Sequence, residues 1–208
     1  MMANERNNVN GYILAGGKSS RMGTDKGLLL LNGRTIVENI IRQLEPAVGK
    51  VTIVANSSRY EQFGVEVIPD IIPGIGPSGG IHAALHHSDS AHNFIVSCDM
   101  PFITTEAIQT IIVRPALTEI TLPFYQQQLE PLFGLYSKNC LDKWKELIRQ
   151  HIFKLKDMIT YFSVKRINVD HNPLFQNTLF MNVNTPADFE VAKKIEHGNS
   201  ASSIRTID

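Results

Sequence analysis

Cysteine is scarce in this chain. Its 208 residues include two, Cys98 and Cys140, which stand far apart and form no C-x-x-C pair. A disulfide scaffold or a thiolate zinc site needs cysteines in clusters or at short fixed spacings. Neither kind of protein is therefore indicated. We expect Cys98, which follows an apolar run, to be a small buried residue.

An excess of charge is also missing. Twenty Lys and Arg residues balance twenty Asp and Glu residues, so the formal net charge is zero. A bulk attraction to nucleic acid or to an acidic membrane is therefore not expected. No apolar run approaches the ~20 residues of a membrane span, and residues 1–8 contain no apolar core of a secretory signal. We expect a cytoplasmic protein that binds neither nucleic acid nor membrane.

What the chain does have is enough apolar sequence for one substantial core. Hydrophobic residues make up 43% of it, which excludes a disordered chain. At about 150 residues per domain, one domain over residues 1–208 is the simplest organisation. The sequence contains neither an internal repeat nor a low-complexity linker.

The first half of the chain alternates apolar runs with helical patterns. Thr35 and Glu38 form a predicted capping box at the start of a helix that must end before Pro46. The other elements expected here are strands at 11–14, 51–55, 65–68 and 94–97, and helices at 59–63, 80–87 and 105–113. This alternation favours βαβ units, an α/β fold and a mostly parallel sheet with helices on both faces.

The second half is less regular. Two paired strands are expected at 119–124 and 129–136, joined by polar glutamines, followed by helices at 141–151 and 155–162 and a strand at 164–169. Thr185, Pro186 and Asp188 predict the start of a last helix, which Gly198 is expected to close. We expect a flexible tail over residues 198–208.

The most informative segment directly follows the first strand. It reads Leu14-Ala15-Gly16-Gly17-Lys18-Ser19-Ser20-Arg21-Met22-Gly23-Thr24-Asp25-Lys26. Glycines let backbone N–H groups approach a phosphate, and Arg21 and Lys26 add cationic donors. The segment fits neither a Walker A loop, which would need glycine at Tyr12, nor the G-x-G-x-x-G dinucleotide fingerprint. It is suited to a triphosphate at the carboxyl edge of a parallel sheet.

This string resembles the signature of the molybdenum cofactor guanylyltransferases. Further stretches of the same family pattern recur in order: Val54-Ala55-Asn56, Pro69-Asp70, Gly76-Pro77-x-Gly79-Gly80, Cys98-Asp99-Met100-Pro101-Phe102, Glu130-Pro131-Leu132 and Asn182-Val183-Asn184-Thr185-Pro186. The resemblance extends from Gly11 to about Ala192. It implies a Rossmann-like nucleotidyltransferase fold, with a nucleotide-binding half at about 9–110 and an acceptor-binding half at about 111–197.

The resemblance also implies a reaction and its site. GMP passes from GTP to the terminal phosphate of molybdenum-bound molybdopterin, with Mg²⁺ as the metal. Other cofactor-biosynthesis proteins or apo-molybdoenzymes are candidate partners. Catalysis then falls to Lys26, Arg21 and Asp99, and Asp99 also holds the metal. The implied nucleotide contacts are Leu14, Ala15, Gly16, Gly17, Lys26, Asn56, Asp70 and Asp99.

The residues themselves support part of this assignment. Asp99 ends an apolar strand, where a carboxylate faces the ligand crevice and suits Mg²⁺. Asn56 and Asp70 follow strands, so each is either a ligand contact or an ordinary turn residue. The resemblance implies that Asn182 and Asn184 lie near the reacting phosphates or on the pterin side of the cleft; the alternative is that Asn184 and Thr185 merely cap the last helix. Where the family usually has Leu-Ala, this chain has Ser78-Gly79.

The histidines do not make a recognisable metal site. His82 and His86 are four residues apart, but the zincin pattern H-E-x-x-H fails because position 83 is alanine. A partly exposed helix face is the expected setting. Three other functions stay open: a cytidylyltransferase for the same cofactor, a sugar-phosphate nucleotidyltransferase, and a nucleotide-binding regulatory module without turnover. The last of these would lack the acidic metal ligand, which Asp99 supplies.

Overall fold

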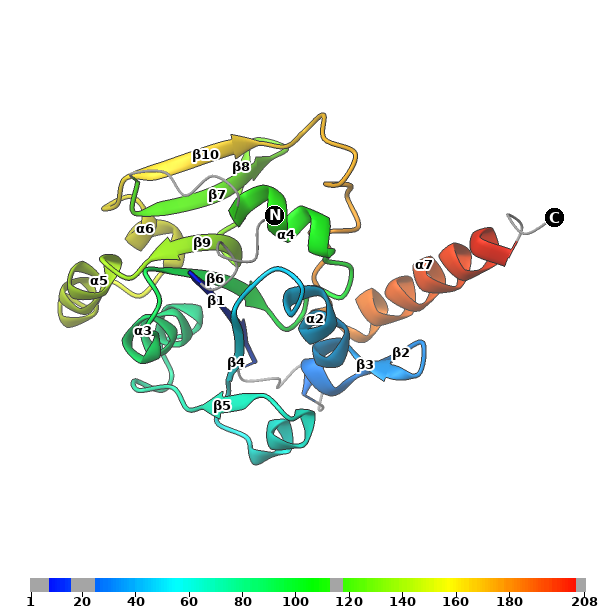
Figure 1. Ribbon diagram of the computed structural model, residues 1–208, viewed down its shortest axis with the longest axis horizontal. Helices are drawn as coiled ribbons and strands as arrows, with labels where there is room; N and C mark the ends of the chain where they lie inside the picture. The colour runs from blue at the N-terminus through cyan, green and yellow to red at the C-terminus, as the bar shows by residue number, and fades with distance from the viewer. Residues whose placement is uncertain (1–7, 16–24, 113–117, 205–208) are drawn as a thin grey trace.

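A single mixed sheet runs through the middle of the protein (Figure 1). The computed structural model describes residues 8–15, 25–112 and 118–204, and side chains as far as residue 196. Within these ranges the sheet order is β10-β7-β9-β6-β1-β4-β5, and β8 pairs with β7. The strands are β1 (Val9–Leu14), β4 (Lys50–Val54), β5 (Glu66–Ile68), β6 (His92–Ser97), β7 (Ile120–Tyr125), β8 (Gln128–Leu129), β9 (Phe133–Ser137) and β10 (Val164–Asn168).

The strand directions place a switch point at β1. This strand is parallel to β4 on one side and to β6 on the other, and β4 is parallel to β5. The chain therefore winds outward from β1 in one direction and returns to continue in the other. In such sheets the ligand crevice lies outside the carboxyl ends of the strands where the order reverses. Strand β9 is antiparallel to β6 and β7, so the sheet is mostly parallel, as predicted.

Helices cover both faces of the sheet and create two apolar cores. Alternate residues of β1 enter different cores: Ile13 packs on one face, and Tyr12 and Leu14 pack on the other. The first core contains residues of α2 (Ile36–Leu44) and α4 (Thr105–Ile112). The second contains residues of α3 (Pro77–His87), α5 (Cys140–Arg149) and α6 (Leu155–Ile159). Burial on both faces explains why β1 is apolar along most of its length.

The predicted capping box of α2 is confirmed. The Thr35 Oγ1 accepts from the Glu38 backbone N–H at 3.2 Å, and a Glu38 carboxylate oxygen accepts from the Thr35 N–H at 2.7 Å. Two backbone donors that the helix leaves free are thereby satisfied. The apolar residues Ile36, Val37, Ile40, Ile41 and Leu44 all face the first core.

Two predictions in the second half are wrong. The last helix, α7 (Pro186–Ile204), continues through Gly198 (Figure 1), because a glycine inside a helix costs only about 1 kcal/mol and need not end it. The strand expected at 129–136 is interrupted. Phe124 faces Leu129 and Thr121 faces Leu135, so three steps along β7 correspond to six along its partner. The extra residues are Glu130–Leu132, a bulge beside Pro123, which has no N–H to donate to the ladder.

A short hairpin near the N-terminus was not predicted. The strands β2 (Leu30–Leu31) and β3 (Arg34–Thr35) pair across Asn32 and Gly33, whose φ values are 52° and 77°. Both values lie in the left-handed region that a two-residue type I′ turn requires. The Asn-Gly dipeptide was the sequence signal for this turn. The hairpin lies next to α2 and α7 (Figure 1), and the Asn32 amide donates to a Glu196 carboxylate oxygen at 3.4 Å.

Candidate functional site

The carboxyl ends of four strands are tied together at one edge of the sheet. The Ala15 N–H donates to the Val54 carbonyl at 2.9 Å, and the Cys98 N–H donates to the Leu14 carbonyl at 3.0 Å. The Ala55 N–H continues this series to the Ile68 carbonyl of β5 at 2.9 Å. Leu14 and Ala15, the first predicted nucleotide contacts, therefore stand at the switch point. Gly16, Gly17 and Arg21 lie outside the described residues.

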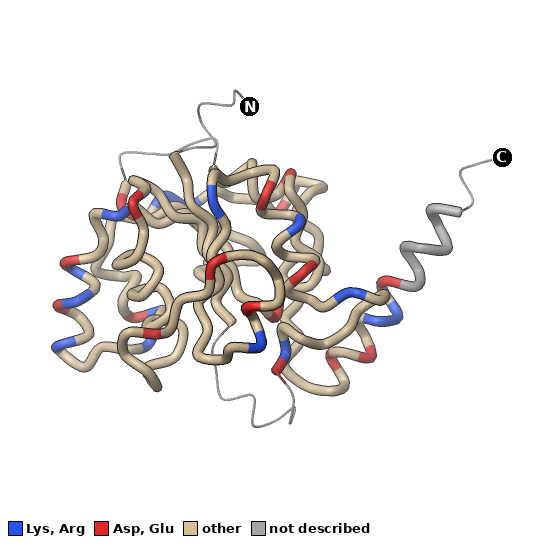
Figure 2. Tube along the Cα trace, turned by 60° about the horizontal axis from the view of Figure 1, so that its bottom comes forward, with Lys and Arg blue, Asp and Glu red and all other residues tan. Residues whose placement is uncertain are grey.

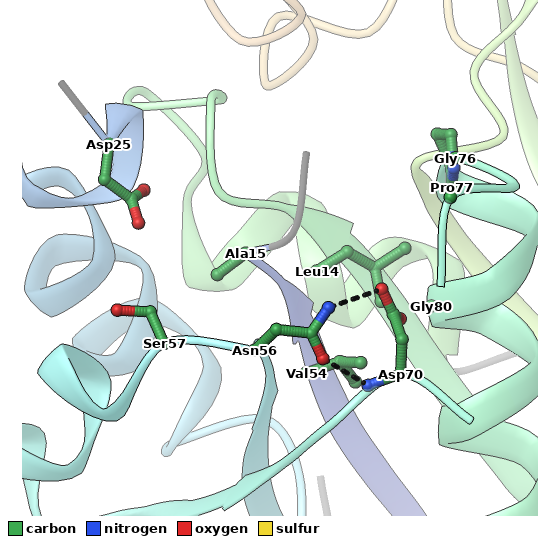
Figure 3. Close-up of a pocket in the computed structure, with 11 residues that line it drawn as sticks. Leu14, Ala15, Asp25, Val54, Asn56, Ser57, Asp70, Gly76, Pro77 and Gly80 are labelled. Atoms are coloured by element: carbon green, nitrogen blue, oxygen red, sulfur yellow. Dashed lines mark hydrogen bonds between the residues drawn. The ribbon is translucent and has the colours of Figure 1, made fainter. Parts of the chain in front are cut away.

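A cavity of about 520 Å³ opens at this edge (Figure 3). The residues that line it come from β1, the N-cap of the 3₁₀ helix η1 (Lys26–Leu28), the segments after β4 and β5, and the start of α3. They are Leu14, Ala15, Asp25, Val54, Asn56, Ser57, Asp70, Gly74, Gly76, Pro77 and Gly80. Its size falls within the range of small-molecule sites, about 300–1,000 Å³. The structure thus brings four of the predicted nucleotide contacts, Leu14, Ala15, Asn56 and Asp70, to one cavity.

Two hydrogen bonds orient Asn56 and Asp70 toward each other in this cavity (Figure 3). The Asn56 amide Nδ2 donates to Asp70 Oδ2 at 3.3 Å, and its Oδ1 accepts from the Asp70 backbone N–H at 3.0 Å. The amide therefore has a fixed orientation. Burial raises the pKa of Asp70, and the Asn56 hydrogen bond opposes that shift. Asp70 Oδ1 takes no part in either of these two bonds.

The start of α3 forms the opposite wall. Gly76 has a φ of 69° and a ψ of −153°, a conformation essentially confined to glycine, and Pro77 follows at the first helical position. Among the described residues no side chain caps this end of the helix; Pro77 has no N–H, and the Gly79 N–H donates to the Gly76 carbonyl at 3.0 Å. A Cβ at Gly80 would lie 3.1 Å from Leu14 Cδ2. Glycine at that position lets the helix approach the end of β1 closely.

The departure at Ser78-Gly79 faces away from the cavity. Ser78 is fully buried, its hydroxyl donates to the Phe153 carbonyl, and the Trp144 indole N–H donates to the Ser78 carbonyl at 3.0 Å. A Cβ at Gly79 would meet the Ile72 carbonyl at 2.9 Å. Ser78 and Gly79 therefore pack α3 closely against Ile72, Phe153 and Trp144. Neither of the two belongs to the lining of the cavity.

A second group of polar side chains lies at the end of β6. The Lys26 ammonium donates to Asn184 Oδ1 at 2.6 Å and lies 3.8 Å from Asp99 Oδ2. The Lys26 and Asp99 side chains are 21% and 17% exposed. The Val183 N–H donates to the Asp99 backbone carbonyl at 2.8 Å, which fixes the distant Asn184 segment beside β6. The structure thus brings Lys26 and Asp99, two of the predicted site residues, together.

One oxygen of this group has no partner. Asp99 Oδ1 is buried and makes no hydrogen bond within the part of the chain that the structure describes. A buried acceptor without a partner is costly, so a cation or a donor from a ligand is the natural complement. A hard cation that prefers oxygen ligands, such as Mg²⁺, fits this carboxylate.

The two asparagines near α7 have different roles. Thr185, not Asn184, provides the cap: its Oγ1 accepts from the Asp188 N–H at 3.2 Å, while Asp188 Oδ2 accepts from the Asn184 and Thr185 N–H groups at 2.9 and 2.7 Å. The Asn184 side chain is therefore available to bind Lys26. The Asn182 amide donates to the Phe180 carbonyl at 3.1 Å.

Sequence reasoning missed a contact behind Asp25. This carboxylate lines the cavity and accepts a hydrogen bond from the Tyr60 hydroxyl, and Arg59 Nη2 lies 3.6 Å from its Oδ2. Tyr60 and Arg59 belong to η2 (Ser58–Phe63), which no motif marks as functional. The Asp-Lys pair that closes the glycine-rich loop was the available signal for Asp25.

The histidine prediction is wrong for His82. Its side chain is buried rather than partly exposed, and neither ring nitrogen has a partner among the described residues. Burial lowers the pKa of His82 and favours the neutral ring. His86, four residues along α3, is exposed as expected. Cys98 is buried as predicted, and burial strongly raises the pKa of its thiol.

The charged residues do not gather by sign. Lys and Arg residues are interspersed with Asp and Glu residues over the described chain, for example along α5 (Figure 2). In the same parts of the chain, no helix combines the length and the apolar character that crossing a bilayer would require.

Comparisons with known proteins agree with this geometry. The MobA-like NTP transferase domain family matches residues 11–163. The molybdenum cofactor guanylyltransferase of Photobacterium profundum is 33% identical over 182 residues, which are 86% of this chain and 92% of that protein. A protein of Carboxydothermus hydrogenoformans named "Probable molybdenum cofactor guanylyltransferase" is 34% identical over 90% of this chain and 96% of its own length.

Solved structures show the same fold. Molybdopterin-guanine dinucleotide biosynthesis protein A from Archaeoglobus fulgidus superposes with a TM-score of 0.77 at 26% identity. The match covers 89% of this chain and 97% of that one. The predicted nucleotidyltransferase-type α/β fold is therefore confirmed.

Proposed function

The chain belongs to the MobA-like NTP transferase family, and on that premise we propose that it transfers GMP from GTP to the terminal phosphate of molybdenum-bound molybdopterin. The observation that carries this proposal is the Lys26–Asp99–Asn184 group beside a nucleotide-sized cavity at the switch point of the sheet. A cation, a carboxylate and an amide at that edge suit substrates that carry several phosphates.

The cavity is the proposed site of the guanosine. Guanine presents a ring N–H and an amino group side by side, and both are donors. The Asp70 carboxylate has an oxygen to accept them, and the Asn56 amide holds that carboxylate in place. The start of α3, with Gly76, Pro77 and Gly80, faces the base and ribose from the other wall. With the base between these walls, the triphosphate extends toward residues 16–24 and Lys26.

Asp99 is the proposed ligand of Mg²⁺, because its buried Oδ1 has no hydrogen-bond partner among the described residues. When bound, the ion would neutralise negative charge on the phosphate oxygens and help to align them. No group of three or more His, Cys, Asp and Glu side chains suited to a metal occurs among the described residues. Substrate phosphates and water are therefore the expected remaining ligands, which is the usual way Mg²⁺ is held in nucleotide sites.

The reaction needs no nucleophile from the enzyme. An oxygen of the acceptor's terminal phosphate forms a bond to the α-phosphorus of GTP, and the bond from that phosphorus to the β-phosphate oxygen breaks. Pyrophosphate carries away the electron pair. Lys26 faces the charge that develops on this leaving group, and Arg21 is proposed to assist it. The contribution of the protein is alignment and charge neutralisation.

The organisation of the whole chain is part of the same proposal. Residues at about 9–110 bind the nucleotide, and residues at about 111–197 bind the acceptor, with the molybdopterin on the Asn182–Asn184 side of Asp99. Cofactor-biosynthesis proteins or apo-molybdoenzymes are the proposed recipients of the product. The proposed cytoplasmic location is tested by fractionating cells that produce a tagged chain.

The central experiment is incubation of the protein with each NTP in turn, Mg²⁺ and molybdopterin, with pyrophosphate release measured. We expect release with GTP and molybdopterin together and not with either substrate alone. Transfer with CTP in preference to GTP would indicate the cytidylyltransferase alternative. Release with a sugar phosphate but not with molybdopterin would indicate a sugar-phosphate nucleotidyltransferase. Binding of GTP without any turnover would indicate a regulatory module.

A further inference from the structure

Tyr60 places a hydroxyl beneath the nucleotide cavity. The side chain is fully buried in η2, and its hydroxyl donates a hydrogen bond to Asp25 Oδ1. Burial raises the pKa of Tyr60 far above its usual value, so the hydroxyl keeps its proton and remains a donor at neutral pH. The partner of this buried hydroxyl is Asp25, which itself lines the cavity.

The Asp25 side chain bonds to η2 rather than capping the helix that it precedes. It occupies the N-cap position of η1 (Lys26–Leu28), where an aspartate commonly accepts from the first N–H groups of a helix. In this chain its side chain makes no capping bond. One oxygen accepts from Tyr60, and the other lies 3.6 Å from Arg59 Nη2. The start of η1 is therefore anchored to η2 instead of being capped.

Gly27 makes this anchor a tight fit. A Cβ on that residue would lie 2.6 Å from the Tyr60 hydroxyl oxygen and 3.4 Å from Cys98 Cβ. The hydroxyl is thus packed against the backbone of η1 as well as bonded to the residue that precedes it. Lys26 lies between these two contacts, and its ammonium reaches Asn184 and Asp99.

We propose that Tyr60 is a positioning residue, which fixes the backbone on both sides of Lys26 and so holds the Lys26 ammonium where the nucleotide phosphates bind. This inference rests on the proposed function for the identity of the nucleotide. Tyr60 itself touches no substrate: its effect passes through Asp25 and Gly27 to Lys26. A residue that acts through one other residue makes no further contribution once that residue has been removed.

The test is a double-mutant cycle with Tyr60→Phe and Lys26→Ala, read in the dissociation constant for GTP with Mg²⁺ and in kcat/KM for guanylyl transfer. Tyr60→Phe keeps the buried ring and removes only the oxygen. In the natural background we expect it to raise the dissociation constant and to lower kcat/KM, each about tenfold, which is the size of one hydrogen bond to a charged group. In the Lys26→Ala background we expect it to change them less than twofold, because the effect travels through Lys26.

Gly27→Ala provides a second variant, because its methyl group displaces the Tyr60 hydroxyl and should reproduce the loss. Tyr12→Phe is the matched control: Tyr12 is equally buried, and its hydroxyl lies 3.0 Å from His87 Nδ1 at the far end of α3. It should leave GTP binding and transfer unchanged. Equal losses from Tyr60→Phe in both backgrounds, or no loss in the natural one, would overturn the inference. Normal GTP binding without any guanylyl transfer would overturn the proposed function instead, while the binding cycle still decides the role of Tyr60.

Discussion

Replacing Asp99 with asparagine removes one negative charge and leaves the shape of the side chain almost unchanged. Asp99 Oδ2 lies 3.8 Å from the Lys26 ammonium, and Oδ1 is buried without a hydrogen bond to any described residue. At an effective dielectric constant of about 20, two unit charges at this separation attract by about 4 kcal/mol before desolvation is counted. Because the two side chains are partly exposed, the net change in folding stability should stay within about 1 kcal/mol.

The effect on catalysis should be much larger. Asp99 is the described carboxylate with a free buried oxygen at the end of β6, so the variant loses the proposed anionic ligand of Mg²⁺. Removing one charge-stabilising group of this kind commonly costs about 10²–10³ in rate. We therefore expect Asp99→Asn and Asp99→Ala to lower guanylyl transfer by that factor and to raise the Mg²⁺ concentration needed for half-maximal rate.

Pyrophosphate release at a series of Mg²⁺ concentrations measures this loss, and thermal unfolding shows that the variants are folded. Asp89→Asn is a suitable control, because Asp89 is exposed and accepts a hydrogen bond from Asn10 at 2.9 Å on the opposite edge of the sheet. It should transfer GMP at the natural rate. A folded Asp99→Asn protein with near-natural rate and Mg²⁺ dependence would refute the assignment and place the metal elsewhere.

Three further predictions concern the phosphates, the base and the buried histidine. Lys26→Ala should lower kcat/KM for GTP. It should change the melting temperature little, because a partly exposed ion pair contributes at most about 1 kcal/mol to stability. A largely unfolded variant with normal GTP binding per folded molecule would show instead that Lys26 is structural. GTP should be preferred over CTP, by up to about 10⁴ in kcat/KM, because guanine-reading groups such as Asp70 lose their partners when cytosine binds; equal values would remove the guanylyl assignment. Burial lowers the pKa of His82, so the unfolded chain takes up a proton that the native ring does not. Urea denaturation should therefore show stability falling as the pH drops below about 6.5, and His82→Leu should flatten that fall; an unchanged pH dependence would contradict it.

The sheet shows which parts of the fold the local sequence could predict. Apolar runs alternating with helical patterns correctly indicated a mostly parallel α/β fold, because strand burial on both faces leaves a continuous apolar signal. The capping box at Thr35 was visible because its two partners are three residues apart. The bulge at Glu130–Leu132 was missed because Pro123 disrupts the ladder only in relation to a neighbouring strand.

The site shows the same division. Asp99 could be named from sequence because it follows an apolar strand at the carboxyl edge of a parallel sheet, whereas the family resemblance was needed to name Asn56 and Asp70. Their pairing could not be named from sequence. Whether Asn56 would meet Asp70 or solvent depends on the twist and register that bring the ends of β4 and β5 together. The interpretation of Ser78-Gly79 likewise needed the packing of α3 against α5.

Sequence alone determined most of the elements, the family pattern and the residue types at the carboxyl edge of the sheet. Those features are local: they depend on the spacing of apolar residues, on glycine and proline, and on short motifs. Tertiary structure decided that Lys26 meets Asn184, 158 positions away, that Asp25 binds Tyr60 and that His82 is buried. Each of these contacts is made by close packing of segments remote in the chain, and side-chain spacing along a single segment carries no record of its partner.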